Sequence, residues 1–348
     1  MIPYIIFIFV VSLLLYKANL EGKNRVFSLM GLLVVFCFTV FRFDVGYDYG
    51  PYYKLIENLN FNRIDEFTKW EPLHLLLIWL CKKVHFTALY MILITAFAQF
   101  CIMYSIIKYN RRNMWYLGMM AYLSMYYLTD MSTMRQAAAV GVIMCSFKFV
   151  AEKRLVPFLL CVLIAFNLHY SSICAILIYV IYNYVNKKNQ LLYFALIIAS
   201  FGFVHLLTLT HYKYYVTDFR SAGGDLLKYI YVFVVLILLF LYRTSKKYDS
   251  VVSSGFYVLL MGVFVPFILG GHIGARMQQY FFCVLFFMIP RIFESYNQRS
   301  RALFCVFFAL LFLSQVYQSH INAVYAGKDQ FIPYRTVFTV DFNYVRLK

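Results

Sequence analysis

Long apolar runs recur along almost the whole chain and are separated only by short polar groups. Of its 348 residues, 63% are hydrophobic and only 14% are charged, which is more apolar surface than a water-soluble chain can bury. The solvent of this chain is therefore lipid. The sequence predicts an all-α, polytopic integral membrane protein, with a single transmembrane domain over residues 1–348.

About twelve of these runs approach the length that crosses a bilayer as a helix. The first run, IPYIIFIFVVSLLLY, lacks the basic start and small-residue cleavage site of a signal peptide, so we expect it to be retained. One further stretch, EPLHLLLIWLCKK, holds only about ten apolar residues, so we expect residues 71–85 to form a short re-entrant or interfacial segment. The predicted spans are residues 3–17, 26–42, 86–107, 113–129, 133–150, 155–168, 170–185, 191–209, 227–242, 252–269, 277–291 and 302–318.

Basic residues gather in small groups after alternate spans, and few acidic residues accompany them. The positive-inside rule places these groups in the cytoplasm and both chain termini outside. The outer side then receives the loop 43–85 with its re-entrant segment, the loop 210–226 and the tail 319–348. Because the net charge of +17 is divided among separate loops, we expect no nucleic-acid partner.

Sequence motifs for common cofactors are absent. The chain has no D-x-D, no G-x-x-x-x-G-K-[ST] and no H-E-x-x-H, and all eight cysteines fall inside apolar segments. We interpret these cysteines as small buried hydrophobes rather than disulfides or metal ligands. We therefore expect no metal and no cofactor.

Unusual polar residues collect where the predicted spans end on the outer side. The motif FRFDVGYDYGPYY combines Arg42, Tyr47 and Asp48. One interpretation is a polar helix exit with an interfacial aromatic belt. The other is a sugar-binding or acid–base loop, in which a tyrosine stacks on a sugar and a carboxylate accepts a proton from an attacking hydroxyl.

Two further motifs each place an arginine at the outer start of a span. STMRQAAAVG contains Arg135 and Gln136, and Arg135 either snorkels to the interface or binds an anion. A helix N-terminus is already positive, so a guanidinium there favours a bound phosphate or diphosphate. GGHIGARMQQYFF contains Arg276, with Gln279 and Tyr280 following it. We expect Arg276 to be the partner of Arg135 in binding an anion.

His169 lies between two apolar runs in FNLHYSSICA, on the same outer side, and Glu71 opens EPLHLLL. Two interpretations of His169 remain open. It is either a structural residue whose hydrogen bonds are satisfied, or a group that accepts a proton as a neutral imidazole or pairs with phosphate as a cation.

These motifs, together with the tail motif IPYRTVF, follow one another in an order that resembles the EpsG family of bacterial O-antigen and exopolysaccharide polymerases, which are Wzy-like membrane proteins. The resemblance covers most of the chain, residues 25 to 340 in round terms. Its most specific parts are the pattern R-x-x-x-G-x-D at Arg42, Gly46 and Asp48, the pair Arg135 and Gln136, and His169.

The resemblance implies a glycosyltransferase that joins undecaprenyl-diphosphate-linked oligosaccharide units at the outer face of the bacterial cytoplasmic membrane. Such enzymes resemble the multi-span GT-C class and work without metal. Donor and acceptor would both be undecaprenyl-diphosphate-linked glycans in the bilayer, and a chain-length regulator protein would be a further partner. The implied residues are His169, Asp48 and Glu71 for catalysis, Arg135, Arg276 and Arg42 for the diphosphate, and Gln136, Tyr47, Gln279, Tyr280, Tyr334 and Arg335 for substrate binding.

Two other functions fit the same outer-face residues. A lipid-linked oligosaccharide ligase would use the same donor with a different acceptor. A flippase or transporter for a polyprenyl-linked sugar would need polar residues along the full depth of its spans, whereas here the cytoplasmic halves are almost bare.

Overall fold

The computed structural model describes residues 1–20, 25–59, 70–110, 114–185, 224–245, 249–269, 271–326 and 329–339, together with residues 189, 193 and 195. Within these residues the regular structure is helical, and the one β-bridge joins Arg42 to Thr336. The all-α prediction is therefore confirmed for the described chain.

In chain order, the helices of this described part are α1 (Ile2–Leu20), α2 (Arg25–Val40), α3 (Tyr49–Asn58), α5 (Pro72–Lys83), α6 (Thr87–Tyr109), α7 (Trp115–Met125), α8 (Tyr127–Ser132), α9 (Met134–Ala151), α10 (Leu155–Leu168), the 3₁₀ helix η1 (Tyr170–Ala175), α11 (Ile176–Tyr184), α14 (Gly224–Thr244), α15 (Ser250–Leu269), α16 (Gly271–Phe282), α17 (Leu285–Phe293) and α18 (Gln298–Ala326).

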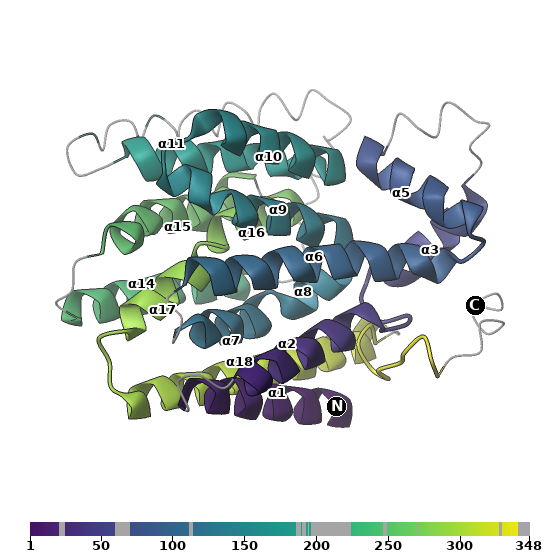
Figure 1. The fold of residues 1–348 in the computed structure, drawn as a ribbon, viewed down its shortest axis with the longest axis horizontal. Coiled ribbons are helices and arrows are strands. Elements are labelled where there is room, and N and C mark those ends of the chain that lie inside the picture. The colour runs from purple at the N-terminus through teal and green to yellow at the C-terminus, as the bar shows by residue number, and fades with distance from the viewer. Residues whose placement is uncertain are drawn as a thin grey trace.

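The long helices lie side by side in a layered bundle (Figure 1). In that view α1, α2 and α18 form the lowest layer, α6 and α7 lie above them, and α10 and α11 lie at the top. The layers are joined by the packing of α7 on α18, α6 on α9 and α9 on α10. The helices α3 and α5 and the segment 329–339 gather at one end of the bundle, which also holds the amino terminus.

Four of the described helices are long and apolar enough to cross a membrane, and they are Thr87–Tyr109, Met134–Ala151, Ser250–Phe267 and Gln298–Ile321. Shorter apolar helices match other predicted spans in α1, α2, α10 and α14. Large apolar side chains on the outside of α18, such as Leu303 and Leu310, are exposed, as expected of a lipid-facing surface. The number of about twelve crossings stays a prediction, and the span 191–209 lies almost wholly outside the described residues.

Three predicted spans differ from the structure because each is divided into two helices. The span 170–185 consists of η1 followed directly by α11. The span 113–129 is interrupted at Tyr126, between α7 and α8. The span 277–291 is interrupted at Cys283 and Val284, between α16 and α17. Tighter bonds from Phe286 N–H to the Cys283 oxygen, and from Phe287 N–H to the Val284 oxygen, replace the helical pattern there. Hydropathy does not register such a break, because the side chains on both sides of it are apolar.

The segments predicted to lie on the outer side contain further helices. The segment 71–85 contains the helix α5, and the loop before it contains the amphipathic helix α3. The first residues of the predicted tail 319–348 belong to α18, which continues to Ala326. Its described part, residues 329–339, packs back against the loop 41–46. In this contact the backbone N–H of Phe43 donates to the backbone oxygen of Arg335 at 2.9 Å. The backbone N–H of Gly46 donates to the backbone oxygen of Gln330 at 2.8 Å.

Gly46 is the tightest point of this loop, and we expect Gly46→Ala to destabilise the protein by about 2 kcal/mol or more. Its φ of +103° disfavours any side chain, and a Cβ there would overlap the backbone oxygen of Met131. Thermal unfolding of the purified protein in detergent measures the effect. Gly50→Ala is the matched control, because its Cβ would meet only Asp44 Oδ1 at an ordinary 3.5 Å. Equal midpoints for the two variants would contradict this account of the loop.

Candidate functional site

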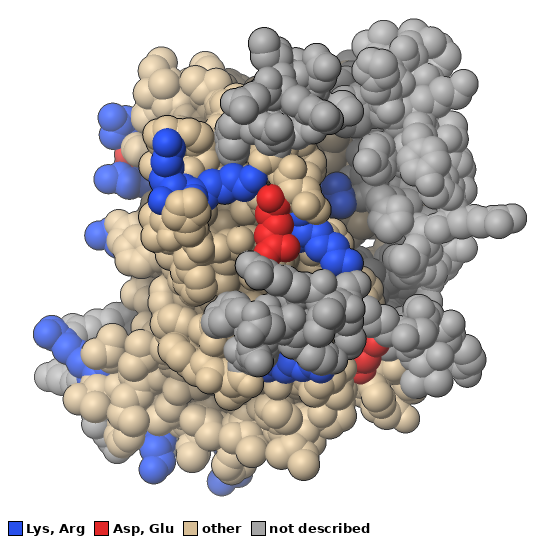
Figure 2. All heavy atoms as spheres, turned by 90° about the vertical axis from the view of Figure 1, so that its right-hand side faces the viewer, with Lys and Arg blue, Asp and Glu red and all other residues tan. Residues whose placement is uncertain are grey.

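Glu71, Arg135 and His169 come from three helix ends that meet in one cluster. Glu71 precedes α5, which begins with Pro72, a residue whose fixed φ suits the first helical position. Arg135 lies in the first turn of α9. His169 has extended backbone, with φ −158° and ψ 119°, which separates α10 from η1. Figure 2 views the end of the bundle that carries α3 and α5, where acidic and basic side chains adjoin near the middle of the face.

Glu71 is the centre of this cluster, between His169 and Arg135. Its Oε1 lies 3.1 Å from Nδ1 of His169 and accepts the backbone N–H of Tyr170 at 3.4 Å. Its Oε2 pairs with Nη1 of Arg135. The side chain is almost fully buried, so the carboxylate is stable there only because these partners compensate its charge. One acidic group therefore holds a base and a cation at the same time.

The pKa values of this pair define its protonation. Burial alone would raise the pKa of Glu71, but the His169 hydrogen bond and the positive charge of Arg135 outweigh burial and lower the pKa to about 2. Burial lowers the pKa of His169 below its ordinary value, although the hydrogen bond to Glu71 opposes that shift. At neutral pH the pair is therefore a carboxylate and a neutral imidazole.

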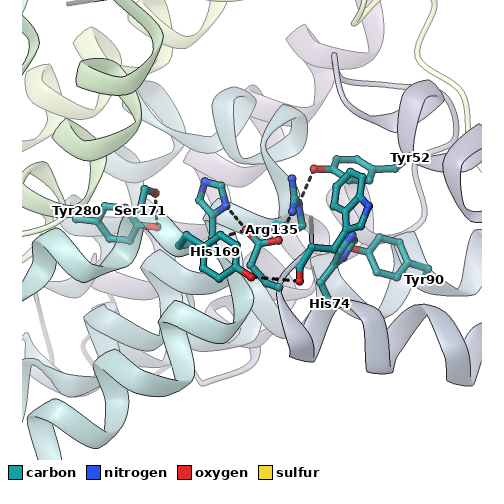
Figure 3. Close-up of polar contacts among 10 residues, drawn as sticks. Tyr52, His74, Tyr90, Arg135, His169, Ser171 and Tyr280 are labelled. Atoms are coloured by element: carbon teal, nitrogen blue, oxygen red, sulfur yellow. Dashed lines mark hydrogen bonds and ion pairs between the residues drawn. The ribbon is translucent and has the colours of Figure 1, made fainter. Parts of the chain in front are cut away.

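This protonation also decides which ring nitrogen is free. An ionised carboxylate only accepts hydrogen bonds, so Nδ1 of His169 carries the ring proton and donates a hydrogen bond to Glu71. Nε2 then holds a lone pair. In Figure 3 the second ring nitrogen of His169 points away from the carboxylate and has no drawn contact. The arrangement is that of a general base whose tautomer and orientation are fixed by a buried acid.

Arg135 is held on several sides. Its Nε donates to the Tyr52 hydroxyl at 2.5 Å, and its guanidinium carbon lies 5.0 Å from the ring centroids of both Tyr52 and Trp70. Together with the Glu71 ion pair, these contacts fix the plane of the group and engage Nε and Nη1. Nη2 makes no hydrogen bond with a described residue, so Arg135 reaches an anion with that nitrogen.

Arg276 and Asp48 are in a different situation. Neither side chain makes a hydrogen bond or an ion pair with any residue that the structure describes. Burial raises the pKa of Asp48, and the nearby charges of Arg276 and Arg135 oppose that rise. The charge of Arg276 also helps to lower the pKa of His169. Arg276 thus acts electrostatically on both candidate bases, while its side-chain donors contact no acceptor in the described part of the chain.

Gln136 and Gln279 lie in the interior, at 2% exposure each. Nε2 of Gln136 donates to the backbone oxygen of Arg276 at 2.7 Å and to Oε1 of Gln279 at 2.6 Å. Gln279 in turn donates to Asp130. The substrate-binding role predicted for these two glutamines stays a prediction, and their contacts are with protein groups.

Arg42 was predicted to bind the diphosphate, but its guanidinium is 1% exposed and donates to backbone oxygens. The acceptors are Val45 at 3.0 Å, Thr39 at 2.5 Å and Met131 at 2.7 Å. This arginine ties the end of α2 to the following loop and to α8. We therefore exclude it from the proposed diphosphate site.

The remaining predicted residues lie around this cluster. The Tyr334 hydroxyl donates to the Phe38 oxygen at 2.5 Å, and Arg335 lies 4.0 Å from Asp44, so both belong to the packed tail. Tyr47 is 53% exposed and is accessible to a ligand. The Tyr280 hydroxyl lies 3.3 Å from that of Ser171 in η1, two residues after His169 (Figure 3).

Sequence reasoning gave no role to several residues of the cluster. The rings of Tyr52 and Trp70 both lie against Arg135, and the His74 imidazole lies 2.5 Å from the Tyr90 hydroxyl. Asp130 is a buried acid within the bundle. A single acidic residue in an otherwise apolar stretch was a signal for Asp130. No sequence signal distinguished Tyr52 and Trp70 from the many other aromatic residues, which make up 21% of the chain.

Metal-ligating side chains do not gather in the described part of the chain. No group of three or more His, Cys, Asp and Glu residues there is arranged to hold a metal ion. In the cluster, Glu71 already contacts both His169 and Arg135.

Comparison with known proteins gives one family. The model of the EpsG family matches residues 24–336, which is nearly the whole chain. No curated protein and no solved structure matches the chain.

Proposed function

The chain belongs to the EpsG family, and from this premise we propose that it is a polysaccharide polymerase that joins lipid-linked oligosaccharide repeat units. The family is associated with exopolysaccharide polymerase activity, and the apolar helices fit a membrane protein. Two finer points belong to the same proposal. The units are carried on undecaprenyl diphosphate, and the site faces the outer side of the bacterial cytoplasmic membrane.

One observation carries this proposal: His169 is neutral and oriented by an acid, and it feels the charge of Arg276, a cation that has no partner among the described residues. Glycosyl transfer from a diphosphate needs a base for the attacking hydroxyl and positive charge for the leaving group. Most protein cations are paired with acids or exposed to solvent. Here one is partly buried and has no described partner, as a site for an anionic ligand requires.

The proposed step is a single displacement at the anomeric carbon of the donor. Nε2 of His169 accepts the proton of the acceptor hydroxyl as its oxygen forms a bond to that carbon. The bond between the carbon and the diphosphate oxygen breaks, and the electron pair leaves with undecaprenyl diphosphate. Such a displacement inverts the anomeric centre. The proton then passes from His169 to solvent or to the departing diphosphate.

The leaving group gains negative charge in this step, and no metal is needed if preorganised cations receive it. The guanidinium of Arg276 and Nη2 of Arg135 are the groups proposed to bind the leaving diphosphate. Asp48 is the second candidate for the base, and the positive charges of Arg276 and Arg135 both act to lower its pKa. Tyr47 is exposed at the same loop and is proposed to stack on a sugar of the acceptor.

Reconstitution tests this function against the transporter alternative. The purified protein in vesicles without an ion gradient or nucleotide is supplied with lipid-linked repeat units on its outer side. We expect ladders of longer lipid-linked chains, resolved by gel electrophoresis. Movement of the lipid between leaflets without any elongation would overturn the proposal.

A deletion strain separates polymerase from ligase. Loss of the polymerase leaves single repeat units attached at the cell surface, because transfer to the final acceptor continues. Loss of a ligase removes all attached glycan, whatever its length. The second phenotype would favour the ligase.

A further inference from the structure

Gln136 connects the two helices that carry the candidate phosphate-binding arginines, Arg135 in the first turn of α9 and Arg276 in the middle of α16. It directly follows Arg135 in α9, and its Nε2 donates to the backbone oxygen of Arg276 in α16 at 2.7 Å. The two residues are 140 positions apart in the chain. One amide group therefore ties the backbone beside one arginine to the backbone of the other.

This connection continues into a buried network. The same Nε2 donates to Oε1 of Gln279 at 2.6 Å, and Nε2 of Gln279 donates to Oδ1 of Asp130 in α8. The three side chains are between 1% and 2% exposed. Water does not compete for hydrogen bonds at such depth, so a network of this kind holds its members in one arrangement. The middle of α16 is thus fixed relative to α8 and α9.

Arg276 depends on this network because its guanidinium has no side-chain partner among the described residues. Only its backbone is fixed. Arg135 is fixed in a different way, by Glu71 and Tyr52. The bond between Gln136 and the Arg276 backbone therefore sets the separation of the two backbone positions from which the guanidinium groups extend.

We propose that Gln136, supported by Gln279 and Asp130, is a positioning residue that sets the spacing of Arg135 and Arg276 to fit the two phosphates of a diphosphate. This inference rests on the function proposed above. In this proposal, the network makes the protein prefer a lipid diphosphate over a lipid monophosphate. A monophosphate engages one guanidinium and is indifferent to the spacing, whereas a diphosphate bridges both.

The test compares two probes, undecaprenyl diphosphate and undecaprenyl monophosphate, on the full chain in nanodiscs. We expect the unaltered protein to bind the diphosphate more tightly. Gln136→Leu keeps the size of the side chain and removes the donor. It is expected to weaken diphosphate binding about tenfold or more and to change monophosphate binding less than about twofold. A purely structural role would weaken both equally and would lower the thermal midpoint.

A charge exchange provides a second variant. Gln279→Glu places two buried carboxylates against each other and is expected to weaken diphosphate binding as strongly as Gln136→Leu. Adding Asp130→Asn restores a donor and an acceptor at the contact, with their places exchanged. We expect the double variant to recover most of the diphosphate preference. The test remains valid even if a single variant folds poorly, because it compares the diphosphate preference of the double variant with that of each single variant.

The outcomes separate this inference from the proposed function. If the unaltered protein elongates lipid-linked units but Gln136→Leu keeps the same preference for diphosphate, the positioning role is wrong and the polymerase function stands. If the unaltered protein shows neither elongation nor any preference for the diphosphate, the function itself is wrong. Failure of the exchange variant to recover the preference, in a protein with a normal thermal midpoint, also overturns the inference.

Discussion

Replacing Glu71 with glutamine is expected to lower the rate of elongation about 10³- to 10⁴-fold while the protein still inserts and folds. Glu71 uses both oxygens, one for the His169 ring and one for Arg135. Glutamine offers only one. If its oxygen faces Arg135, its amide N–H₂ faces His169, which then accepts at Nδ1 and carries its proton on Nε2. The base is lost without any change in size.

The other orientation of the glutamine amide is expected to lower the elongation rate as strongly. Its oxygen then serves His169, and its N–H₂ group faces the donors of Arg135. A buried guanidinium is left without its acid, and we expect Arg135 to move. Elongation of lipid-linked units by the purified variant measures both effects. Glu152→Gln is the matched control, since Glu152 also lies near two basic residues, Lys148 and Arg154, but is exposed at 44%. Equal activity of the two variants would remove Glu71 from the site.

The pH dependence of elongation gives an independent readout of the same base. The active form has an unprotonated Nε2, and burial places the pKa of His169 below its ordinary 6.5. The rate should therefore be level near neutral pH and fall only as the pH drops through a value below 6.5. Glu71, with a pKa of about 2, stays ionised through that fall. An acid limb that disappears in Asp48→Asn would assign the base to Asp48, whose pKa burial raises.

Replacing Arg276 with lysine is expected to lower the elongation rate about 10²- to 10³-fold with no change in thermal midpoint. Lysine keeps the positive charge and loses the planar fork that grips a phosphate with two donors. Because no described side chain depends on the Arg276 guanidinium, the fold loses nothing. Steady-state kinetics with lipid-linked units measure the effect, and unfolding in detergent provides the stability.

Arg42→Lys is the informative contrast to that variant. Arg42 donates to backbone oxygens of Thr39, Val45 and Met131, so lysine leaves buried acceptors unsatisfied. We expect this variant to unfold at a lower temperature. Its activity should fall only in proportion to the amount of folded protein. A lower midpoint for Arg276→Lys, with full activity of the remaining folded protein, would show that the two roles are exchanged.

The fold class and most helices followed from the sequence because hydropathy is a local property. The apolar runs placed α6, α9 and α10 within two residues of their observed ends. The breaks near Tyr126 and Cys283 could not be predicted in this way. Both lie within apolar stretches, so a break in the helix leaves the hydropathy profile unchanged. The backbone groups freed by such a break find hydrogen-bond partners through packing, which the sequence does not reveal.

The candidate site was predicted in part. Charge asymmetry and the cost of polar groups in lipid pointed to Glu71, Arg135, His169 and Arg276, because such groups are kept in membranes only where they have partners or tasks. The same reasoning treated Arg42 as equivalent to Arg135. Sequence position gave no means of telling a guanidinium surrounded by carbonyl oxygens from one that faces a ligand.

The sequence by itself therefore determined that this chain is an all-α membrane protein with polar groups at particular helix ends, and its motifs indicated the family. Only the tertiary structure decided which of those groups act together. Glu71 meets Arg135 across 64 positions of the chain and His169 across 98. These contacts depend on how three helix ends converge, and local periodicity does not contain that information. The same packing leaves Arg276 without a described partner and gives Gln136 its bond to the Arg276 backbone.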